Sequence, residues 1–440
     1  MYLADSRSTK PAAAPGTRPG RRAAAVPGTV VALGAVSLIT DISSEMVTAV
    51  LPLYVVATLG LSPLGFGLLD GINNGVGALV RLTGGHLADR GGRRHKMVAA
   101  AGYGLSALCK PLLLLAHGLP AISAVLAVDR TGKGLRTAPR DAMISLATRP
   151  EHRGRAFGVH RAMDTTGALL GPLAAFAVLR VAGGPLLGEG GAAGGYGAVF
   201  AVSGCVAALG VLVLVLFVPP RITRAEAPGA DRGTAATTDT GPRPTLRDSL
   251  ALLRRPRLRR LTLCAALLGL TTVSDSFLYL LLQRELRLPA HLFPLLPLGT
   301  AAAFLLLAVP LGALADRAGR RRLFLAGHGL LLLGYALLLS PLPGTLVLPA
   351  VLLLHGAFYA ATDGVLAAAT AGAVPAEHQG AGQALVGTGQ ALARFACSIA
   401  FGSAWSLWGG RGALTAAAVS LAAAAVVAGF VLRTADEVPA

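Results

Sequence analysis

A ten-residue pattern that occurs twice constrains this chain more than any other feature of its sequence. Residues 85–94 read G-H-L-A-D-R-G-G-R-R, and residues 312–321 read G-A-L-A-D-R-A-G-R-R. Asp89 and Asp316 are 227 residues apart in a chain of 440 residues. Glu151 and Glu377, each followed by a histidine, are 226 residues apart. Two landmarks that share one spacing indicate an internal duplication in which each copy is half the chain.

The composition is that of a membrane protein. Hydrophobic residues make up 54% of the chain and charged residues 14%, and the mean hydropathy is +0.64. A soluble domain of this length does not need so many apolar residues for its core. We expect an all-α integral membrane protein whose twelve transmembrane helices form two pseudo-symmetric six-helix bundles. The expected helices span residues 29–57, 64–88, 97–116, 121–148, 156–179, 197–218, 261–282, 292–315, 323–340, 346–374, 380–405 and 411–432.

These segments also predict how the chain is divided. Residues 1–28 are rich in Ala, Pro, Gly and Arg and lack apolar periodicity, which is typical of a disordered tail. The N-terminal six-helix bundle is expected at 29–218 and the C-terminal bundle at 261–432, with a linker at 219–260 between them. The linker and both tails, 1–28 and 433–440, are expected in the cytoplasm.

The position of the basic residues predicts this orientation. Of the 39 lysines and arginines, 27 lie in the two tails and in the loops on the same side of the membrane. Cytoplasmic loops carry such an excess, so we expect a multi-pass protein of the cell (plasma) membrane with both termini in the cytoplasm. The net charge of +18 therefore reflects topology in a lipid bilayer and does not indicate nucleic-acid binding.

The repeated pattern resembles the signature loop of the major facilitator superfamily of secondary transporters, which lies between helices 2 and 3 and is echoed between helices 8 and 9. The resemblance covers nearly the whole chain and implies a transporter that works by alternating access. In the family this loop locks the cytoplasmic side of the outward-facing state. The residues assigned to this gate are Gly85, Asp89, Arg90, Gly92 and Arg93 in the first copy, Gly312, Asp316, Arg317, Gly319 and Arg320 in the second, and Asp141 as a partner of Arg90 or Arg93.

Charges inside the expected helices are the candidates for function, because an ionised side chain in hydrocarbon needs a partner or a water-filled cavity. Asp41 lies about 11 residues into its helix, or roughly 17 Å, near the middle of the bilayer. Asp41 and Glu45 are four residues apart and share one helix face. Two neighbouring buried carboxylates raise each other's affinity for a proton. The alternatives are permanent salt bridges to helix 4 or direct contact with a substrate.

Helix 4 carries the largest group of basic residues. Asp129, Lys133, Arg136 and Arg140 have helical spacing and are expected to form a stripe down one face. Arg130 and Gly134 resemble the family's helix 4 motif R-x-x-q-G, in which the arginine stabilises the deprotonated acid of proton-coupled members. Lys133 departs from the pattern, because it stands where the family usually has glutamine.

Helix 5 combines a bend motif with a second acidic site. Gly167, Gly171 and Pro172 resemble the G-x-x-x-G-P motif that marks exporters in the family, and glycines four apart allow two helices to approach closely. The resemblance thus favours a bacterial, proton-coupled, efflux-type subgroup. His160 and Asp164 are four residues apart, which suits either a proton relay or a packing histidine.

The predicted function is secondary active transport of a small solute, most simply proton-coupled export by antiport. The alternatives are a proton-coupled importer of a small polar or anionic metabolite and, in another class, a membrane sensor or scaffold that does not transport. The surplus of bases in the first bundle favours an anionic or zwitterionic solute. Candidates for proton coupling are Asp41, Glu45, Arg130, His160 and Asp164, and candidates for the substrate cavity are Asp70, Lys133, Arg136, Asp275, Tyr279, His355, Tyr359, Asp363, Gln390 and Arg394.

Other classes of function have no support in the sequence. The chain lacks a G-x-x-x-x-G-K-[ST] phosphate-binding loop, so nothing indicates that ATP drives it. Its four cysteines are unpaired in sequence and lie inside apolar segments, which supports neither a disulfide framework nor a zinc site. We expect a monomer with no cofactor, no metal and no enzymatic activity, whose partners are a small-molecule substrate, protons and lipid.

Overall fold

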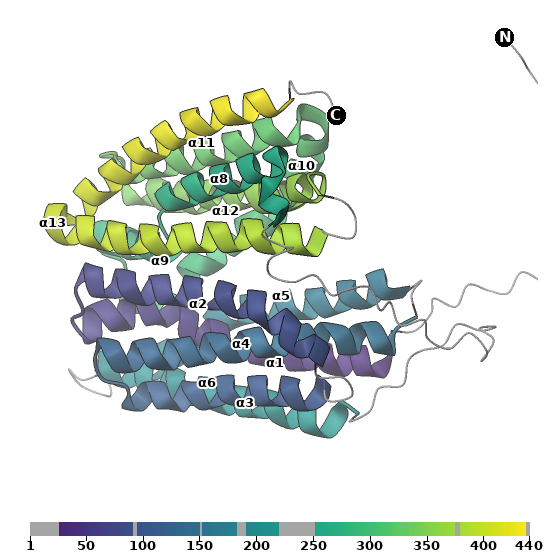
Figure 1. Ribbon diagram of the computed structural model, residues 1–440. Coiled ribbons are helices and arrows are strands. Elements are labelled where there is room, and N and C mark those ends of the chain that lie inside the picture. Colours follow the sequence, from purple (N-terminus) through teal and green to yellow (C-terminus); the bar gives the residue numbers. More distant parts are fainter. Residues whose placement is uncertain are drawn as a thin grey trace, which may run out of the picture.

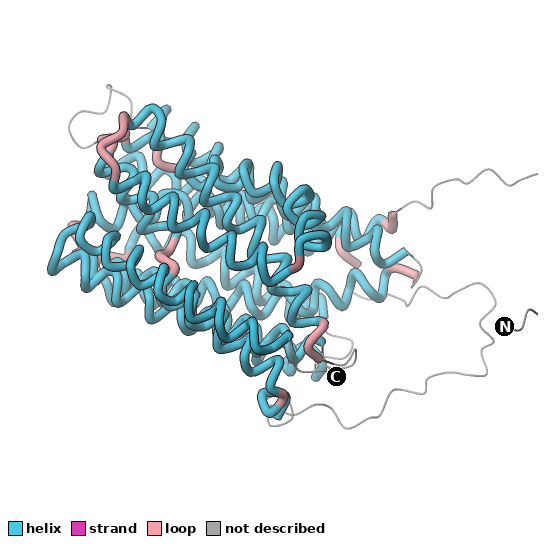
Figure 2. The backbone as a smooth tube through the Cα atoms, turned by 90° about the horizontal axis from the view of Figure 1, so that it is seen from above, coloured by secondary structure: helices cyan, strands magenta, loops and turns pink. Residues whose placement is uncertain are grey.

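The computed structural model describes residues 26–90, 95–149, 152–182, 191–219, 251–374 and 379–436. All regular secondary structure in these ranges is helical. The helices form two bundles, one from each half of the chain (Figure 1). Within each bundle the helices run side by side and are joined by short loops (Figure 2). The predicted all-α fold with two six-helix bundles is confirmed.

The N-terminal bundle contains six crossings. Its first helix ends in a π-helical turn, η1, which follows Pro52 near the end of the helix. The elements are α1 (Gly28–Leu53) with η1 (Tyr54–Thr58), α2 (Pro63–Arg90), α3 (His95–Leu115), α4 (Leu119–Ala147), α5 (Arg153–Ala182) and α6 (Gly191–Phe217).

The C-terminal bundle also crosses six times, but its helices are less regular. The first crossing is broken at residues 272–274 into α8 and α9. The last two crossings, which together carry the label α13, are two helices that meet at Gly409, where the backbone is not helical and φ is 74°. Only glycine adopts this backbone conformation without strain. The elements are η5 (Leu252–Arg254), α8 (Pro256–Thr271), α9 (Asp275–Glu285), η6 (Ala290–Leu292), α10 (Leu295–Ala318), α11 (Arg320–Leu339), α12 (Gly344–Ala371) and α13 (Gln379–Asp436).

Some boundaries differ from those that the sequence predicts. The first helix of the C-terminal bundle begins at Pro256, inside the expected linker, because proline is well suited to the first position of a helix. The last helix continues to Asp436, beyond the expected start of the C-terminal tail. Residues 1–25 and 220–250 are outside the described residues, so the disordered tail and most of the linker stay predictions.

Hydropathy alone finds fewer spans than the fold contains. In the described part of the chain, nine segments are long and apolar enough to cross a membrane, with all of α13 counted as one segment. Helices α2 and α4 are missing from this set. Both carry several ionisable residues within their length, and the structure uses these residues to build the site.

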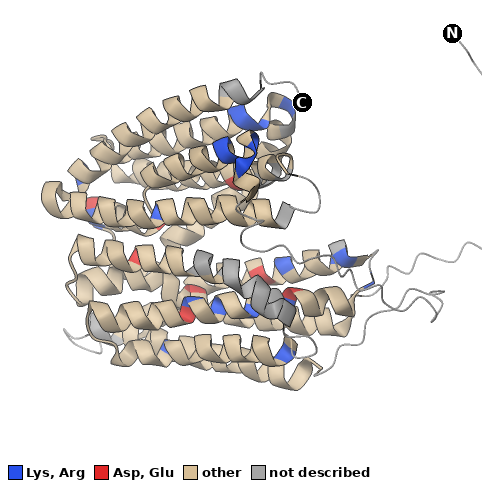
Figure 3. Ribbon diagram, viewed as in Figure 1, with Lys and Arg blue, Asp and Glu red and all other residues tan. Residues whose placement is uncertain are grey.

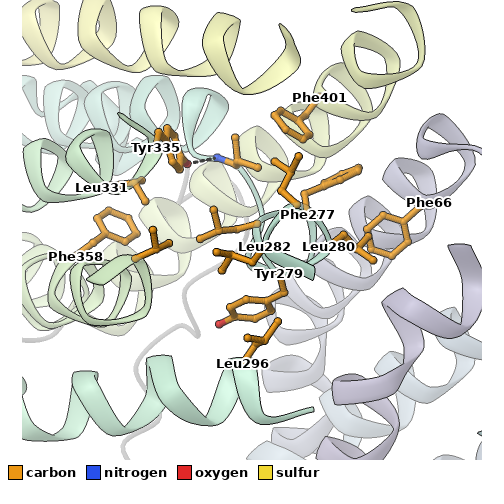
Figure 4. Close-up of a cluster of buried hydrophobic side chains, with 14 of the residues drawn as sticks. Phe66, Phe277, Tyr279, Leu280, Leu282, Leu296, Leu331, Tyr335, Phe358 and Phe401 are labelled. Atoms are coloured by element: carbon orange, nitrogen blue, oxygen red, sulfur yellow. Dashed lines mark hydrogen bonds between the residues drawn. The ribbon is translucent and has the colours of Figure 1, made fainter. Parts of the chain in front are cut away.

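The two bundles meet where α2 packs against α13, at the ends that lie away from the chain termini (Figure 1). A Cβ atom on Gly67 would overlap the backbone carbonyl of Ser398, so only glycine allows this approach. Phe66 of α2 and Phe401 of α13 both pack edge-on against Phe277 of α9, with ring centroids 4.9 Å apart in each pair (Figure 4). Aromatic packing and close backbone contact therefore join the bundles at this end.

We predict that Gly67→Val opens this junction, because a branched side chain cannot fit against the Ser398 carbonyl. Spin labels on Leu64 of α2 and Leu407 of α13, which are 43% and 76% exposed, should report longer separations in the variant after replacement of the native cysteines. The matched control is Gly104→Val, since a Cβ at Gly104 meets nothing within 4 Å. An unchanged distance distribution in Gly67→Val would contradict the prediction.

Candidate functional site

A charged cavity of about 420 Å³ lies inside the N-terminal bundle. Four helices of that bundle surround it: α1, α2, α4 and α5. Its lining combines two carboxylates with five basic side chains. Acidic and basic positions lie close together along the ribbon in the middle of this bundle (Figure 3). The described lining residues are Asp41, Asn73, Arg130, Lys133, Gly134, Arg136, Thr137, Arg140, Arg161 and Asp164.

Asp41 of α1 is the centre of this charged cavity. One of its carboxylate oxygens lies 3.5 Å from a terminal nitrogen of Arg136 and 3.9 Å from the Lys133 ammonium. The Arg136 guanidinium stacks over the ring of Tyr103, 4.4 Å from its centroid, which fixes the arginine in place. Asp41 and Asp164 line the same cavity from α1 and α5, and a proton carried by either would allow a hydrogen bond between neighbouring carboxyl groups.

Asp164 reaches Asp41 because α1 and α5 pack closely along their length. A Cβ atom on Gly167 would overlap the Leu38 carbonyl, and one on Gly171 would lie 2.6 Å from the Cβ of Glu45. The two glycines of the G-x-x-x-G-P motif therefore set the distance between these helices. Asp164 also lies 3.7 Å from both Arg140 and Arg161, so it has basic and acidic neighbours at once.

His160 does not form the expected relay with Asp164. Its Nε2 atom is 3.0 Å from the Ser37 hydroxyl, which also accepts a hydrogen bond from Arg140 at 3.3 Å. The histidine is buried. A spacing of four residues puts His160 and Asp164 on one face of α5, but the imidazole of His160 is hydrogen-bonded to the Ser37 hydroxyl of α1. Ser37 therefore links His160 to Arg140, which lines the charged cavity.

The structure changes the expected role of two further charged residues, Arg130 and Asp129. Arg130 donates a hydrogen bond to the Asn73 side chain of α2, whereas the basic residues paired with Asp41 are Lys133 and Arg136. Asp129 turns away from the expected stripe, because it forms a buried ion pair with Lys110 of α3 at 2.9 Å. The stripe therefore consists of Lys133, Arg136 and Arg140, and Asp129 instead joins α3 to α4.

A second cavity, of about 400 Å³, lies between the two bundles. Asn73 lines both this cavity and the charged cavity, so the two cavities adjoin at this residue. Asn73 was not among the residues selected from the sequence. Its only signal there is its position between Gly71 and Gly75 inside an expected membrane helix. The described lining of this central cavity includes Glu45, Thr48, Asp70, Asn73, Pro172, Thr272, Asp275, Ser276, Tyr279, Thr300, Tyr359, Asp363 and Arg394.

Asp275 organises the wall that the C-terminal bundle contributes. The break between α8 and α9 makes it the first residue of α9, where the helix dipole favours a carboxylate. It accepts a hydrogen bond from the Tyr359 hydroxyl at 2.6 Å and lies 3.0 Å from Nε2 of His355. The Arg394 guanidinium lies 5.8 Å from the centre of the Tyr359 ring. Tyr279 packs edge-on against His355, with ring centroids 6.3 Å apart.

The remaining cavity candidates lie in different places. Glu45 lines the central cavity, whereas Asp41 lines the charged one, so the two carboxylates do not share a cavity. Asp70 accepts a hydrogen bond from Ser398 of α13 at 2.7 Å, which links the two bundles beside the central cavity. Asp363 lines that cavity, but Gln390 is not among its described lining residues, because its part of α13 packs against Gly269 of α8.

The repeated motif is only partly visible. Of the first copy, Gly85, Asp89, Arg90, Gly92 and Arg93 lie where side chains or backbone are outside the described residues, as does the side chain of Asp316. In the second copy, Gly312 lies inside α10 and Arg317 in its last turn, Gly319 joins α10 to α11 with a φ of 94°, and Arg320 begins α11. Asp141 lies 3.1 Å from Arg140, so the described partner is its neighbour in sequence.

Comparison with known proteins identifies the family. A model described as the Major Facilitator Superfamily matches residues 33–305 and 261–440 of the chain. The chain therefore belongs to the major facilitator superfamily. It is thus a multi-pass membrane protein of a family of transporters. Among the described residues, no group of three or more His, Cys, Asp or Glu side chains could hold a metal ion.

The curated relatives match over a limited region. An uncharacterized MFS-type transporter of Methanocaldococcus jannaschii is 37% identical over 139 residues, which are 32% of this chain and 34% of the relative. An uncharacterized protein of Mycobacterium tuberculosis is 36% identical over 155 residues, which are 35% of this chain and 37% of the relative. The chain thus spans about a third of the length of these relatives.

Solved structures match over almost the whole chain. A bacterial homologue of the human lysosomal transporter Spinster, in an inward-facing and unoccupied conformation, has a TM-score of 0.76 at 17% identity and covers 95% of this chain and 98% of its own. The nucleoside transporter NupG has a TM-score of 0.71 at 14% identity and covers 92% of this chain and 99% of its own. At these identities the similarity shows the fold.

We predict that Asp129→Asn destabilises the protein strongly, because it leaves the Lys110 ammonium buried without its counter-charge. Loss of one partner of a buried ion pair costs about 3–5 kcal/mol. Replacing both partners, as in Lys110→Met with Asp129→Leu, should restore most of the free energy of unfolding measured in detergent. The control is Glu285→Gln, which breaks the more exposed pair with Arg411 and should cost less than about 1 kcal/mol. Similar losses in both single variants would contradict the prediction.

Proposed function

We propose that the protein is a proton-coupled exporter that exchanges protons for a small solute. The observation that carries the proposal is the pair of carboxyl groups, Asp41 and Asp164, that face each other inside a cavity rich in basic side chains. One proton shared between two neighbouring carboxyl groups allows a hydrogen bond between them. Arg136 and Lys133 compete with that proton for Asp41, because a cation near a carboxylate favours its ionised form.

This arrangement can link protonation to movement of the helices. When Asp41 is ionised, its contacts with Arg136 and Lys133 hold α1 against α4. When it is protonated, these contacts lose most of their electrostatic attraction and the helices separate more easily. A switch of this kind needs a group that is accessible to water in one state, and the lining of the charged cavity supplies it. The coupling site would then lie entirely within the N-terminal bundle.

The central cavity is the proposed site of the solute. Its described lining contains four carboxylates and one arginine, namely Glu45, Asp70, Asp275, Asp363 and Arg394. We therefore propose a cationic or zwitterionic solute whose positive group contacts the acids and whose polar end contacts Arg394. The sequence favours an anionic or zwitterionic solute because of the basic residues in the first bundle. Five of those basic residues line the charged cavity and not the central one.

The orientation of the protein supports a particular starting state. With both termini in the cytoplasm, as the lysine and arginine distribution predicts, the contacts between α2 and α13 lie on the outer side of the membrane. The central cavity would then be closed from outside by the Phe66, Phe277 and Phe401 cluster and by the Asp70 bond to Ser398. This state would accept a solute from the cytoplasm, as an exporter requires.

The direction of transport can be measured separately from the identity of the solute. A thermal-shift screen of cationic and zwitterionic metabolites on the protein in detergent supplies the ligand. Uptake of that ligand into everted vesicles with an acidic interior then reports export, and uptake into right-side-out vesicles with an acidic exterior reports import. Export is supported by the close contact of α1 and α5 at Gly167 and Gly171. Uptake in right-side-out vesicles only would favour the importer, and uptake in neither would favour the non-transporting alternative.

We predict that Asp41→Asn and Asp164→Asn each reduce transport driven by a pH gradient by at least tenfold, because neither variant retains the pair that shares the proton. Exchange of labelled for unlabelled solute without a gradient should persist at about half the normal rate or more. Asp141→Asn is the matched control, because Asp141 contacts Arg140 but does not line the charged cavity as described. Normal gradient-driven transport in Asp41→Asn would exclude this residue as the proton carrier.

We predict that Arg130→Lys loses most transport, although the charge is retained. The Nε atom of the Arg130 guanidinium donates a hydrogen bond to Asn73, which lies between the two cavities. A lysine has no planar group with a donor at this position, so its ammonium group cannot reproduce the contact. The rate should fall at normal expression while solute binding, measured by thermal shift, changes little. Asn73→Asp with Arg130→Lys tests the same contact, because an added carboxylate can accept from the lysine. Wild-type rates in Arg130→Lys would show that this contact is dispensable.

A further inference from the structure

A third cavity, of about 370 Å³, lies at the end of the C-terminal bundle that faces the termini. It has no connection to the transport site through its described lining. Four arginines from the first turns of two helices surround it, Arg257 and Arg260 of α8 and Arg320 and Arg321 of α11. Its described lining contains no aspartate or glutamate. Figure 3 shows basic residues gathered at this end of the bundle.

The rest of the wall is apolar. It is formed by the ends of α12 and α13 and by the second turns of α8 and α11, so the cavity has a charged rim and a hydrocarbon floor. Arg321 also donates a hydrogen bond to the backbone carbonyl of Leu432 at 3.2 Å, which holds α11 against α13 at this point. The apolar lining residues are Leu261, Phe324, Val365, Leu366, Ala369, Ala373 and Leu432.

We propose that this cavity binds the phosphodiester headgroup of an anionic phospholipid. Arginine guanidinium groups match phosphate oxygens in pairs of hydrogen bonds, and the beginnings of α8 and α11 add the positive ends of two helix dipoles. Basic pockets between membrane helices on the cytoplasmic side are suited to anionic lipid headgroups. The volume leaves room for the phosphate and the glycerol attached to it.

The position of the cavity favours a lipid over a soluble phosphate compound. Leu263 lies one helical turn further along α8 than Arg260 and is 61% exposed. In a membrane-spanning helix such a side chain faces acyl chains, so Arg260 lies at the level where headgroups begin. A lipid whose phosphate contacts the arginines can therefore pack its acyl chains against the apolar surface of α8. A soluble phosphate would use the same arginines but would gain nothing from this apolar surface.

The bound lipid would join α8 and α11 to the ends of α12 and α13. These four helix ends belong to one bundle, and the repeated motif supplies two of the arginines, Arg320 and Arg321. The same basic residues thus serve topology and lipid binding. A lipid that binds the folded chain at this cavity stabilises the folded state, so the C-terminal bundle should be more stable when the lipid is bound.

The test is a thermal-shift titration of the full chain in a neutral detergent with three probes: diheptanoyl phosphatidylglycerol, diheptanoyl phosphatidylcholine and glycerol 3-phosphate. We expect only phosphatidylglycerol to raise Tm, by several degrees. Arg257→Gln with Arg320→Gln should lose at least half of that rise. Arg259→Gln with Arg322→Gln removes the same charge from the same two helices outside the cavity and should keep the rise.

Four outcomes would overturn the proposal. An equal loss in the two double variants would mean that diffuse charge binds the lipid, and an equal rise with phosphatidylcholine would mean that the acyl chains alone act. An equal rise with glycerol 3-phosphate would assign the cavity to a soluble phosphate compound. Native mass spectrometry of phosphatidylglycerol retained by each variant gives a second measurement if a substitution lowers the Tm without ligand. Retention at wild-type level by the Arg257 and Arg320 variant would also overturn the proposal.

Discussion

The structure depends on how it compensates charge in a medium of low dielectric constant. Each ionised side chain inside the bundles needs an opposite charge on another helix, and two kinds of compensation occur. Asp129 and Lys110 make a buried contact at 2.9 Å with little exposure of either side chain. Asp41 lies 3.5 Å from Arg136 and 3.9 Å from a partly exposed Lys133, in a cavity. The first pair fixes α3 on α4, whereas the second can exchange partners with water, protons or solute.

The helical fold could be predicted almost completely from the sequence, because duplication and apolar length are strong signals. Two features could not. The chain from Leu267 to Val273 is apolar without interruption apart from threonines, so nothing in its pattern shows that the helix breaks before Asp275. The sequence predicts that the first helix of the C-terminal bundle begins at residue 261, whereas α8 begins at Pro256. The arginines between these positions are not typical of a membrane helix, although they form its first turns.

The site could be predicted less well, because spacing along one helix does not say which neighbour a side chain meets. Asp41 and Glu45 share a face of α1, but that face borders two cavities and each carboxylate lines a different one. The carboxyl group that shares a cavity with Asp41 belongs to Asp164, on another helix and 123 positions later. Asn73 carries no charge, so a search for buried charge passes over it, although it links the cavities.

The division into two cavities limits how protons and solute can be coupled. The charged cavity lies within one bundle, whereas the central cavity is formed by both, so a proton on Asp41 cannot repel or attract the solute by direct contact. The contact of Arg130 with Asn73 is the shortest described connection between them. A change in the position of α4 when Asp41 releases its bases would pull on this contact and alter the lining of the central cavity on α2. Coupling of this kind is mechanical, because it requires α4 to move relative to α1 and α2 inside the N-terminal bundle.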